Sequence, residues 1–209
     1  MDRKSYGQTC PMGAALDVVG DRWTILLLRE LLGGAGRFTE LYEGLPGIAK
    51  NLLSSRLVRL EEDGIIRRVS SGSAMLYGLT ERGFAIRPTL EHLGFWGAGV
   101  ERVGPVVHQR SIRAIAMALQ AIIARVPAAM PKDAAVVELD AEGKFLEIRL
   151  GPRPTVTARA TNDADGRFRI PFAALPAYLS GDGLDPEQLI LVSGDPALKA
   201  CLLRALGAG

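Results

Sequence analysis

The chain has 209 residues, and its 25 lysines and arginines nearly balance 23 aspartates and glutamates, which leaves a net charge of +2. That charge is too small for a protein that binds nucleic acid through bulk positive charge, although it permits a local basic patch. The sequence has neither an apolar stretch long enough to cross a bilayer nor a basic-then-apolar leader, so we expect a cytoplasmic protein without a membrane partner.

The first predicted elements are amphipathic helices over residues 12–19 and 23–32. Their apolar side chains recur with helical spacing and form one stripe, which comprises Leu16, Val19, Trp23, Leu26, Leu27 and Leu31. We expect this stripe to pack against the elements that follow and to act as scaffold. A tryptophan can also serve as a ligand platform, but Trp23 lies inside a periodic apolar helix and is interpreted as a core residue.

A helix-turn-helix is predicted over residues 38–63. Residues 38–45 have the apolar spacing of a short helix, and Pro46-Gly47 then forces a turn. The helix predicted for residues 49–63 has a narrow apolar side, formed by Leu53, Leu57 and Leu60, and a polar outer side. A helix of this kind fits the major groove of DNA, so it is the candidate reader of base sequence.

A basic hairpin follows the candidate reader. Gly64 ends the helix, strands are predicted over residues 65–70 and 74–79, and residues 71–73 form the turn. Such a hairpin is a wing whose arginines meet phosphates beside the groove. The predicted contacts to a double-stranded DNA operator are Lys50, Asn51, Ser54, Ser55, Arg56, Arg59, Arg67 and Arg68. The alternative interpretation is that these side chains form ordinary solvated faces of a small helical domain.

Residues 10–96 resemble the HxlR-type winged helix-turn-helix transcription regulators of bacteria. The resemblance is carried by Cys10-Pro11, by residues 16–20, 23–31, 37–41, 45–48, 53–64 and 77–83, and by Trp96. The sequence departs from the family pattern at Asp21-Arg22, where Gly-Lys is common, and in the wing, which lacks the usual proline-bearing stretch. The resemblance implies a sequence-specific DNA-binding regulator that forms a homodimer and presents two readers to a two-fold symmetric operator.

A long helix is predicted over residues 81–101, capped by Thr80 and kinked at Pro88 because proline removes a backbone donor and clashes with the preceding turn. Its apolar side chains are too many for a lone exposed helix; they are Phe84, Ile86, Leu90, Leu93, Phe95, Trp96 and Val100. Pairing with a second copy of the chain would bury them, as would docking on the C-terminal half of the same chain.

A composition shift near Gly97 divides the chain into predicted domains of residues 1–104 and 105–209. The second domain is predicted to have a helix over 111–125 and strands over 135–140, 145–150, 155–161 and 167–170. A helix over 172–179, a short helix that begins at 185–186, and a final helix that is capped at 195–196 and runs through 206 are predicted to follow. The predicted fold class is α+β. It combines an N-terminal winged helix-turn-helix, mostly α with a β-hairpin wing, and a small antiparallel C-terminal sheet covered by helices.

The C-terminal half resembles the sterol-carrier-protein-like fold, chiefly in residues 170–179, 184–187 and 192–198 and in Gly181. Because that fold can enclose an apolar tunnel, the resemblance implies a small hydrophobic effector as a partner. The candidate lining side chains are Leu146, Ile148, Phe168, Phe172, Leu175, Tyr178, Leu198 and Leu202. The alternatives are that these side chains are plain core, or that this domain strengthens dimerisation.

The two cysteines receive different interpretations. Cys10 occupies the family's N-terminal cysteine position, where some members sense oxidants or electrophiles, and its place at a helix start favours the thiolate. It is also compatible with a small apolar filler. Cys201, in the last apolar helix, is expected to be buried, and a disulfide between the two is not expected.

No catalytic constellation is found in the sequence. His92 and His108 are too few and too scattered for a metal cluster, and neither a phosphate-binding glycine motif nor a nucleophile elbow occurs. We therefore expect no enzyme activity, cofactor or metal. The predicted function is transcription regulation by a DNA-binding homodimer that responds to a small apolar effector. The competing interpretation is a hydrophobic-ligand carrier whose N-terminal unit does not bind DNA.

Overall fold

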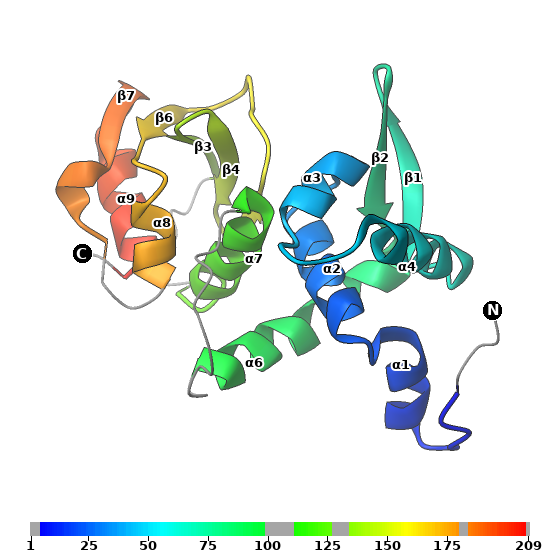
Figure 1. Ribbon diagram of the computed structural model, residues 1–209. Coiled ribbons are helices and arrows are strands. Elements are labelled where there is room, and N and C mark those ends of the chain that lie inside the picture. The colour runs from blue at the N-terminus through cyan, green and yellow to red at the C-terminus, as the bar shows by residue number, and fades with distance from the viewer. Residues whose placement is uncertain (1–4, 99–110, 127–133, 180–183, 208–209) are drawn as a thin grey trace. The chain divides into compact units, whose positions relative to one another are not determined.

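The computed structural model describes residues 5–98, 111–126, 134–179 and 184–207 (Figure 1). The chain divides into two compact units, Met1–Leu93 and Gly94–Gly209. The predicted boundary between residues 104 and 105 lies outside the described residues. Within the described residues, no helix is long and apolar enough to cross a membrane.

The first unit begins with helices at nearly the predicted positions: α1 (Pro11–Val19), α2 (Arg22–Leu32), α3 (Phe38–Glu43) and α4 (Lys50–Glu62). Leu27 and Leu31 of the predicted apolar stripe are buried, which confirms their scaffold role. Leu16 is 39% exposed, so the expectation that it packs in the stripe is wrong. The physical reason is that α1 lies at the edge of this unit (Figure 1), so part of its surface is left to solvent.

The predicted wing is present as an antiparallel hairpin of β1 (Ile66–Ser71) and β2 (Ala74–Leu79). Gly72 at its tip has φ +59°, a conformation that favours glycine. A short third segment joins the hairpin, because Gly36 and Tyr77 exchange two backbone hydrogen bonds of 3.0 and 2.8 Å. The wing is thereby tied to the loop between α2 and α3.

The base of the wing is fixed by Thr80 and Gly83. The Thr80 hydroxyl donates to the carbonyl of Gly64 at 2.7 Å and accepts from the N–H of Gly83, which caps α5 (Glu81–Phe84). A Cβ atom on Gly83 would lie 2.1 Å from the carbonyl oxygen of Ile65. Only glycine therefore permits this close approach of α5 to the start of the wing.

The single kinked helix predicted over residues 81–101 is in fact two helices, α5 and α6 (Arg87–Ala98). Pro88 is the second residue of α6, where its missing N–H costs no helical hydrogen bond. The proline thus stands at a helix start, and the predicted kink is wrong. The predicted continuation beyond Ala98, including Val100, lies outside the described residues.

The second unit contains helix α7 (Ile112–Ile123) and a five-stranded sheet in the order β5-β4-β3-β6-β7. Its strands are β3 (Ala135–Ala141), β4 (Lys144–Leu150), β5 (Thr155–Thr157), β6 (Gly166–Arg169) and β7 (Ile190–Gly194). The prediction of an antiparallel sheet is wrong for one pair, because β3 and β6 are parallel. After β5 the chain crosses to the other side of β3, and a crossover connection rather than a hairpin produces a parallel pair.

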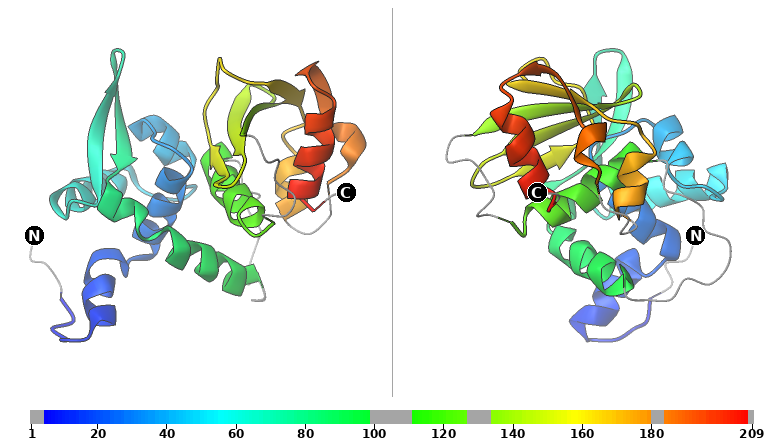
Figure 2. Two further views of the ribbon diagram at one scale, coloured as in Figure 1. Left: turned by 180° about the vertical axis from the view of Figure 1, so that it is seen from behind. Right: turned by 90° about the vertical axis from the view of Figure 1, so that its left-hand side faces the viewer.

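Short helices complete the second unit: α8 (Ala174–Ala177), the 3-10 helix η3 (Pro186–Gln188) and α9 (Ala197–Ala205). The core of the unit lies between the sheet and its helices (Figures 1 and 2). Alternate residues of β3 and β4 face this core, among them Val137, Leu139, Leu146 and Ile148, and all of these are at most 1% exposed. Gln120 of α7 donates to the carbonyl of Pro154 and accepts from the N–H of Val156, which joins that helix to β5.

Candidate nucleic-acid interface

The turn between α3 and α4 sets the position of the candidate reader. Leu41 and Leu45 are buried and anchor the end of α3 in the core. Ile48 is buried directly after the turn. Gly47 between them has φ +92°, and a Cβ at this position would lie 3.7 Å from the ring of Trp23. Trp23 therefore lies against the turn, but it is only half-buried and does not belong to the fully buried core.

The two sides of α4 differ as the sequence pattern predicts. Leu53, Leu57 and Leu60 are at most 1% exposed and fix the helix to the unit. The opposite side carries exposed residues that make no hydrogen bond outside the helix within the described part of the chain; they are Asn51, Ser54, Ser55 and Val58. This side offers amide and hydroxyl groups, which can donate to and accept from base edges.

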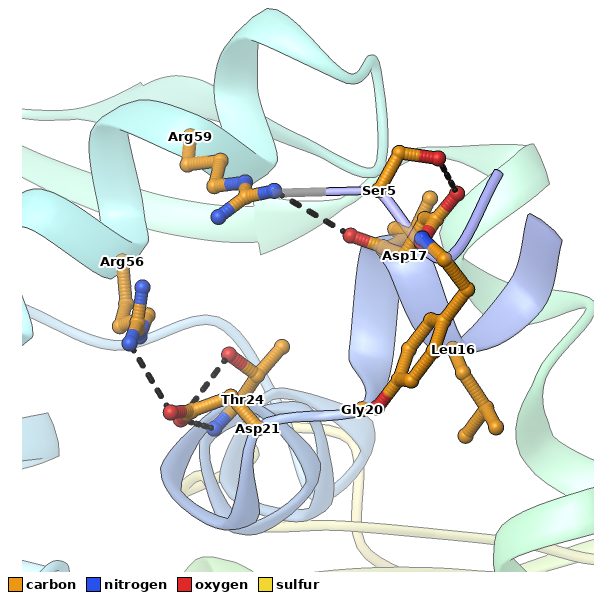
Figure 3. A pocket seen from close by; sticks show the side chains of 10 residues that line it. Ser5, Leu16, Asp17, Gly20, Asp21, Thr24, Arg56 and Arg59 are labelled. Atoms are coloured by element: carbon orange, nitrogen blue, oxygen red, sulfur yellow. Dashed lines mark hydrogen bonds and ion pairs between the residues drawn. The ribbon is translucent and has the colours of Figure 1, made fainter. Parts of the chain in front are cut away.

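The basic residues of α4 do not all project from that outer side. Lys50 is exposed, with its ammonium 5.3 Å from the centre of the Tyr42 ring. Arg56 and Arg59 lie on the flank of α4 that faces α1 and α2 (Figure 3), and both are partly buried. The sequence pattern alone does not distinguish these two environments.

Arg56 and Arg59 are held by acceptors that the sequence analysis did not identify. Arg56 Nη2 lies 2.9 Å from Asp21 Oδ2, and Arg59 Nη2 donates to the carbonyl oxygen of Asp17 at 3.3 Å. Burial alone would raise the pKa of Asp21, but hydrogen bonds from Thr24 and Trp23 and the charge of Arg56 outweigh it and hold that pKa below its ordinary value. An aspartate at a predicted helix start indicates a capping residue. The sequence does not indicate that the same aspartate also pairs with Arg56.

The wing presents its arginines on different faces. Arg67 and Arg68 are adjacent in β1, so their side chains point to opposite sides of the hairpin. Arg68 Nη2 lies 3.2 Å from Glu61 Oε2 of α4, and its guanidinium lies 5.9 Å from the centre of the Tyr77 ring. Arg67 is exposed and has no ion pair within the described residues.

Comparison with known proteins identifies this architecture. The family model described as HxlR-like helix-turn-helix matches residues 18–103. The HTH-type transcriptional regulator YdeP of Bacillus subtilis is 35% identical over 91 residues, which cover 42% of this chain and 71% of that relative. The HTH-type transcriptional regulator YodB of the same organism is 33% identical over 91 residues, which cover 42% of this chain and 81% of YodB.

The chain belongs to the HxlR-like helix-turn-helix family. The DNA-binding transcription regulation expected from the sequence is thereby supported for the first unit. Among solved structures, the redox regulator HypR in its oxidised form is 32% identical, with a TM-score of 0.43, and covers 45% of this chain and all (100%) of HypR. Quinone-bound YodB from B. subtilis is 32% identical, with a TM-score of 0.39, over 44% of this chain and 100% of YodB.

The cysteine at the start of the HxlR-like unit is exposed. Cys10 immediately precedes α1, and its side chain does not cap that helix through a hydrogen bond of ordinary geometry. The backbone N–H groups of Gly13 and Met12 at the start of α1 nevertheless favour the thiolate and lower the pKa of the Cys10 thiol. Cys201 is buried, as predicted, and neither cysteine takes part in a disulfide.

The predicted ligand-lining residues all belong to the core of the second unit, which lies largely outside the family match. Leu146, Ile148, Phe168, Leu175 and Leu202 are at most 1% exposed, whereas Phe172, Tyr178 and Leu198 are only partly buried at the margin of the core. Lining a tunnel therefore stays a prediction, as does the likeness to the sterol-carrier fold. Among the described residues, no cluster of histidine, cysteine and acidic side chains suited to a metal ion occurs.

Proposed function

We propose that the protein is a homodimeric, sequence-specific regulator in which the outer side of α4 reads base edges. The observation that carries this proposal is the exposure of Asn51, Ser54 and Ser55 opposite the buried leucines of the same helix. These side chains have the donors and acceptors that major-groove edges match. Lys50 and Arg67 flank them with exposed positive charge, which suits phosphate contacts.

Arg56 and Arg59 have a different role in this proposal. Both side chains already bind acceptors in α1 and α2, so a DNA contact would require them to exchange partners. They hold α4 in the orientation from which its outer side meets the groove. Arg68, paired with Glu61, is a phosphate contact only after that pair opens.

A second copy of the chain is the proposed partner of α5 and α6. Phe84, Leu93 and Trp96 are 47%, 43% and 70% exposed, an unusual number of large apolar side chains for such short helices. Burial in a two-fold dimer would remove them from water and place two copies of α4 about 34 Å apart, one turn of DNA. Sedimentation of the wild type against Trp96→Ser tests this: the variant is expected to dissociate at higher concentration.

The second unit is proposed to bind a small apolar effector that changes the orientation of the paired readers. Support comes from the margin of its core, where Phe172, Tyr178 and Leu198 are incompletely covered. An effector that prefers one dimer geometry would alter operator affinity, typically by a factor of about 5 to 150. Titration with long-chain fatty acids, with operator affinity measured at each step, tests this; an effector that binds without changing that affinity rules out its regulatory role.

Selection of genomic DNA fragments by the purified protein tests the central proposal. The selected operator is then bound to Asn51→Ala and Ser54→Ala, and each is expected to lose about 1 to 3 kcal/mol of specific binding. Asn162→Ala is the matched control, because Asn162 is an exposed asparagine in the second unit. A hydrophobic-ligand carrier would select no operator at all, and the variants would leave its ligand affinity unchanged.

Sensing through Cys10 is a second candidate function, favoured by the exposure of this thiol and its lowered pKa. A quinone, the ligand named for YodB, is the first electrophile to use. The thiolate would add to a ring carbon of the quinone and form a carbon–sulfur bond as the carbon–carbon double bond opens. The electron pair passes to a quinone oxygen, which takes a proton from water, and transfer of the ring proton through water to the other oxygen leaves a hydroquinone thioether. Mass mapping locates the adduct, with buried Cys201 as the internal control, and operator affinity is measured on the same sample. Unchanged affinity after complete modification of Cys10 removes this candidate.

A further inference from the structure

A pocket lies beside α4, on the flank away from its outer reading side (Figure 3). Its volume is about 520 Å³, within the range that small organic ligands occupy. Its lining residues among those that the structure describes all belong to the first unit; they are Ser5, Tyr6, Leu16, Asp17, Val18, Gly20, Asp21, Thr24, Arg56 and Arg59. The pocket therefore involves the N-terminal segment, α1, the start of α2 and the candidate reader.

The arginines of this pocket have unused hydrogen-bonding capacity. Arg56 Nε is buried without a hydrogen-bond partner among the described residues, although the end of the same guanidinium pairs with Asp21. Arg59 donates to the main-chain carbonyl of Asp17, which is a neutral acceptor, and has no carboxylate partner within the described part of the chain. A buried donor without an acceptor costs about 1 to 3 kcal/mol, so an added acceptor here is favourable.

The nearby carboxylates are directed to other donors. Asp17 accepts from the Ser5 hydroxyl at 2.7 Å and from the N–H of Tyr6 at 2.8 Å. One oxygen of Asp21 accepts from the first N–H groups of α2, which leaves its other oxygen for Arg56. Among the described lining residues, two aspartates face two arginines, and an incoming anion must compete with Asp21 for Arg56.

The remaining wall of the pocket is apolar. Leu16 is 39% exposed, Val18 is partly exposed, and Tyr6 is 61% exposed, so these side chains retain apolar surface that a ligand can cover. A planar guanidinium binds carboxylate oxygens through paired hydrogen bonds. The pocket thus joins a site for an acid group to a surface for a hydrocarbon body.

We infer that this pocket binds a small organic carboxylate, whose acid group pairs with Arg59 and Arg56 and whose apolar body covers Leu16 and Val18. The regulatory consequence rests on the proposed DNA-reading function of α4. When the ligand replaces Asp21 as the partner of Arg56, the link between α4 and the start of α2 is broken. Operator affinity is then expected to fall about fivefold or more, the lower limit of typical allosteric coupling.

Benzoate is the first probe, and benzamide is its neutral control with the same ring. Calorimetric titration of the full chain is expected to show benzoate binding about tenfold more tightly than benzamide, because only the acid forms charge-assisted hydrogen bonds. Phenylacetate and octanoate extend the series to longer bodies. If the acids bind no better than benzamide, or if none binds, the inference is overturned.

Variants separate this pocket from other binding sites. Arg59→Gln is expected to reduce benzoate affinity about tenfold. Arg204→Gln is the matched control, because it removes an exposed charge in the second unit. Leu16→Glu introduces a negative charge at an exposed position of α1 and is expected to abolish binding. Leu16→Gln removes the same apolar contact without adding a charge and is expected to weaken binding much less. Circular dichroism verifies that each variant is folded, and equal affinity of Arg59→Gln and the wild type contradicts the inference.

Operator affinity with and without benzoate tests the regulatory step separately. If benzoate lowers the operator affinity of the wild type fivefold or more but does not lower that of Arg59→Gln, the regulatory step is supported. Benzoate binding with unchanged operator affinity overturns the regulatory step. If the chain binds benzoate but no operator is found, the carboxylate pocket stands and the proposed DNA-reading function fails, so the two outcomes are distinguishable.

Discussion

Asp21 Oδ2 lies 2.9 Å from Arg56 Nη2, while the other oxygen of the same carboxylate accepts hydrogen bonds from the N–H groups of Trp23 and Thr24. One side chain thus caps α2 and holds the flank of α4. Helix α4 is thereby connected to α2. The stability of α2 and the placement of α4 both depend on this aspartate.

Substitution of Asp21 is expected to separate its two roles. Asp21→Ala removes both the cap and the ion pair, whereas Asp21→Asn keeps a side chain that caps well. We expect the alanine variant to lower the free energy of unfolding about 1 kcal/mol more than the asparagine variant does. Urea unfolding of the full chain, followed by tryptophan fluorescence, measures this difference. Equal losses in the two variants would mean that capping contributes nothing here.

The wing arginines are expected to differ in their contribution to DNA binding. Arg67 is exposed, so Arg67→Ala should weaken binding to all sequences and reduce the salt dependence of affinity by about one counterion. Arg68→Ala should have a smaller effect, because its guanidinium is paired with Glu61 at 3.2 Å. Affinity is measured across a series of salt concentrations, with Arg204→Ala as the charge-matched control. Identical slopes for wild type and Arg67→Ala would exclude a phosphate contact.

Helix α4 was predictable because its sequence pattern is local. Leucines at 53, 57 and 60 recur at helical spacing, and Pro46-Gly47 marks the turn before them. The environments of Arg56 and Arg59 were not predictable, because their partners lie 35 and 42 residues earlier in the chain. Helical spacing predicts on which face of a helix a side chain lies. It does not predict which acceptor from a distant part of the chain packs against that face.

The second unit illustrates the same limit at the level of strands. Alternation in residues 135–140 and 145–150 predicts the β3–β4 hairpin, since a short turn requires antiparallel neighbours. The parallel pairing of β6 with β3 depends on where the chain goes after β5, which no local pattern specifies. Strand β7 was not predicted at all. Its apolar run is short and ends at Gly194, whose φ is +104°.

Gly83→Ala is expected to destabilise the first unit strongly. The added Cβ would lie 2.1 Å from the carbonyl oxygen of Ile65, and a backbone atom cannot move aside as a flexible side chain does. We expect a loss of about 3 kcal/mol, the upper range for overpacking. Gly94→Ala is the control, because no described atom lies within 4 Å of the position that its new methyl group would take, and alanine favours a helix. A thermal unfolding comparison in which both variants behave alike would contradict the close contact.

The acid sensitivity of the second unit is expected to depend on Glu147. This carboxylate is only 3% exposed and lies 2.9 Å from Arg149 Nε and 2.6 Å from Arg159 Nη2. Burial raises its pKa, but the hydrogen bonds from Arg159 and Arg149 outweigh burial, so the pKa lies below its ordinary value of 4.5. A carboxylate with a lowered pKa stabilises the fold above its unfolded pKa, and this contribution is lost as the pH falls through the folded value.

Glu147→Gln preserves the shape of the side chain and removes its charge. At pH 7 we expect the variant to be less stable than the wild type by about 1 kcal/mol, a modest value because both arginines are about half exposed and screened by water. The difference should stay constant down to pH 4.5 and shrink below it, as the wild-type carboxylate takes up a proton. Urea unfolding at a series of pH values measures it. Glu187→Gln is the control for the change in composition, because Glu187 is exposed and has no ion pair within the described residues. If the difference in stability between Glu147→Gln and the wild type persists undiminished at the lowest pH, the shape of the side chain and not its charge is responsible.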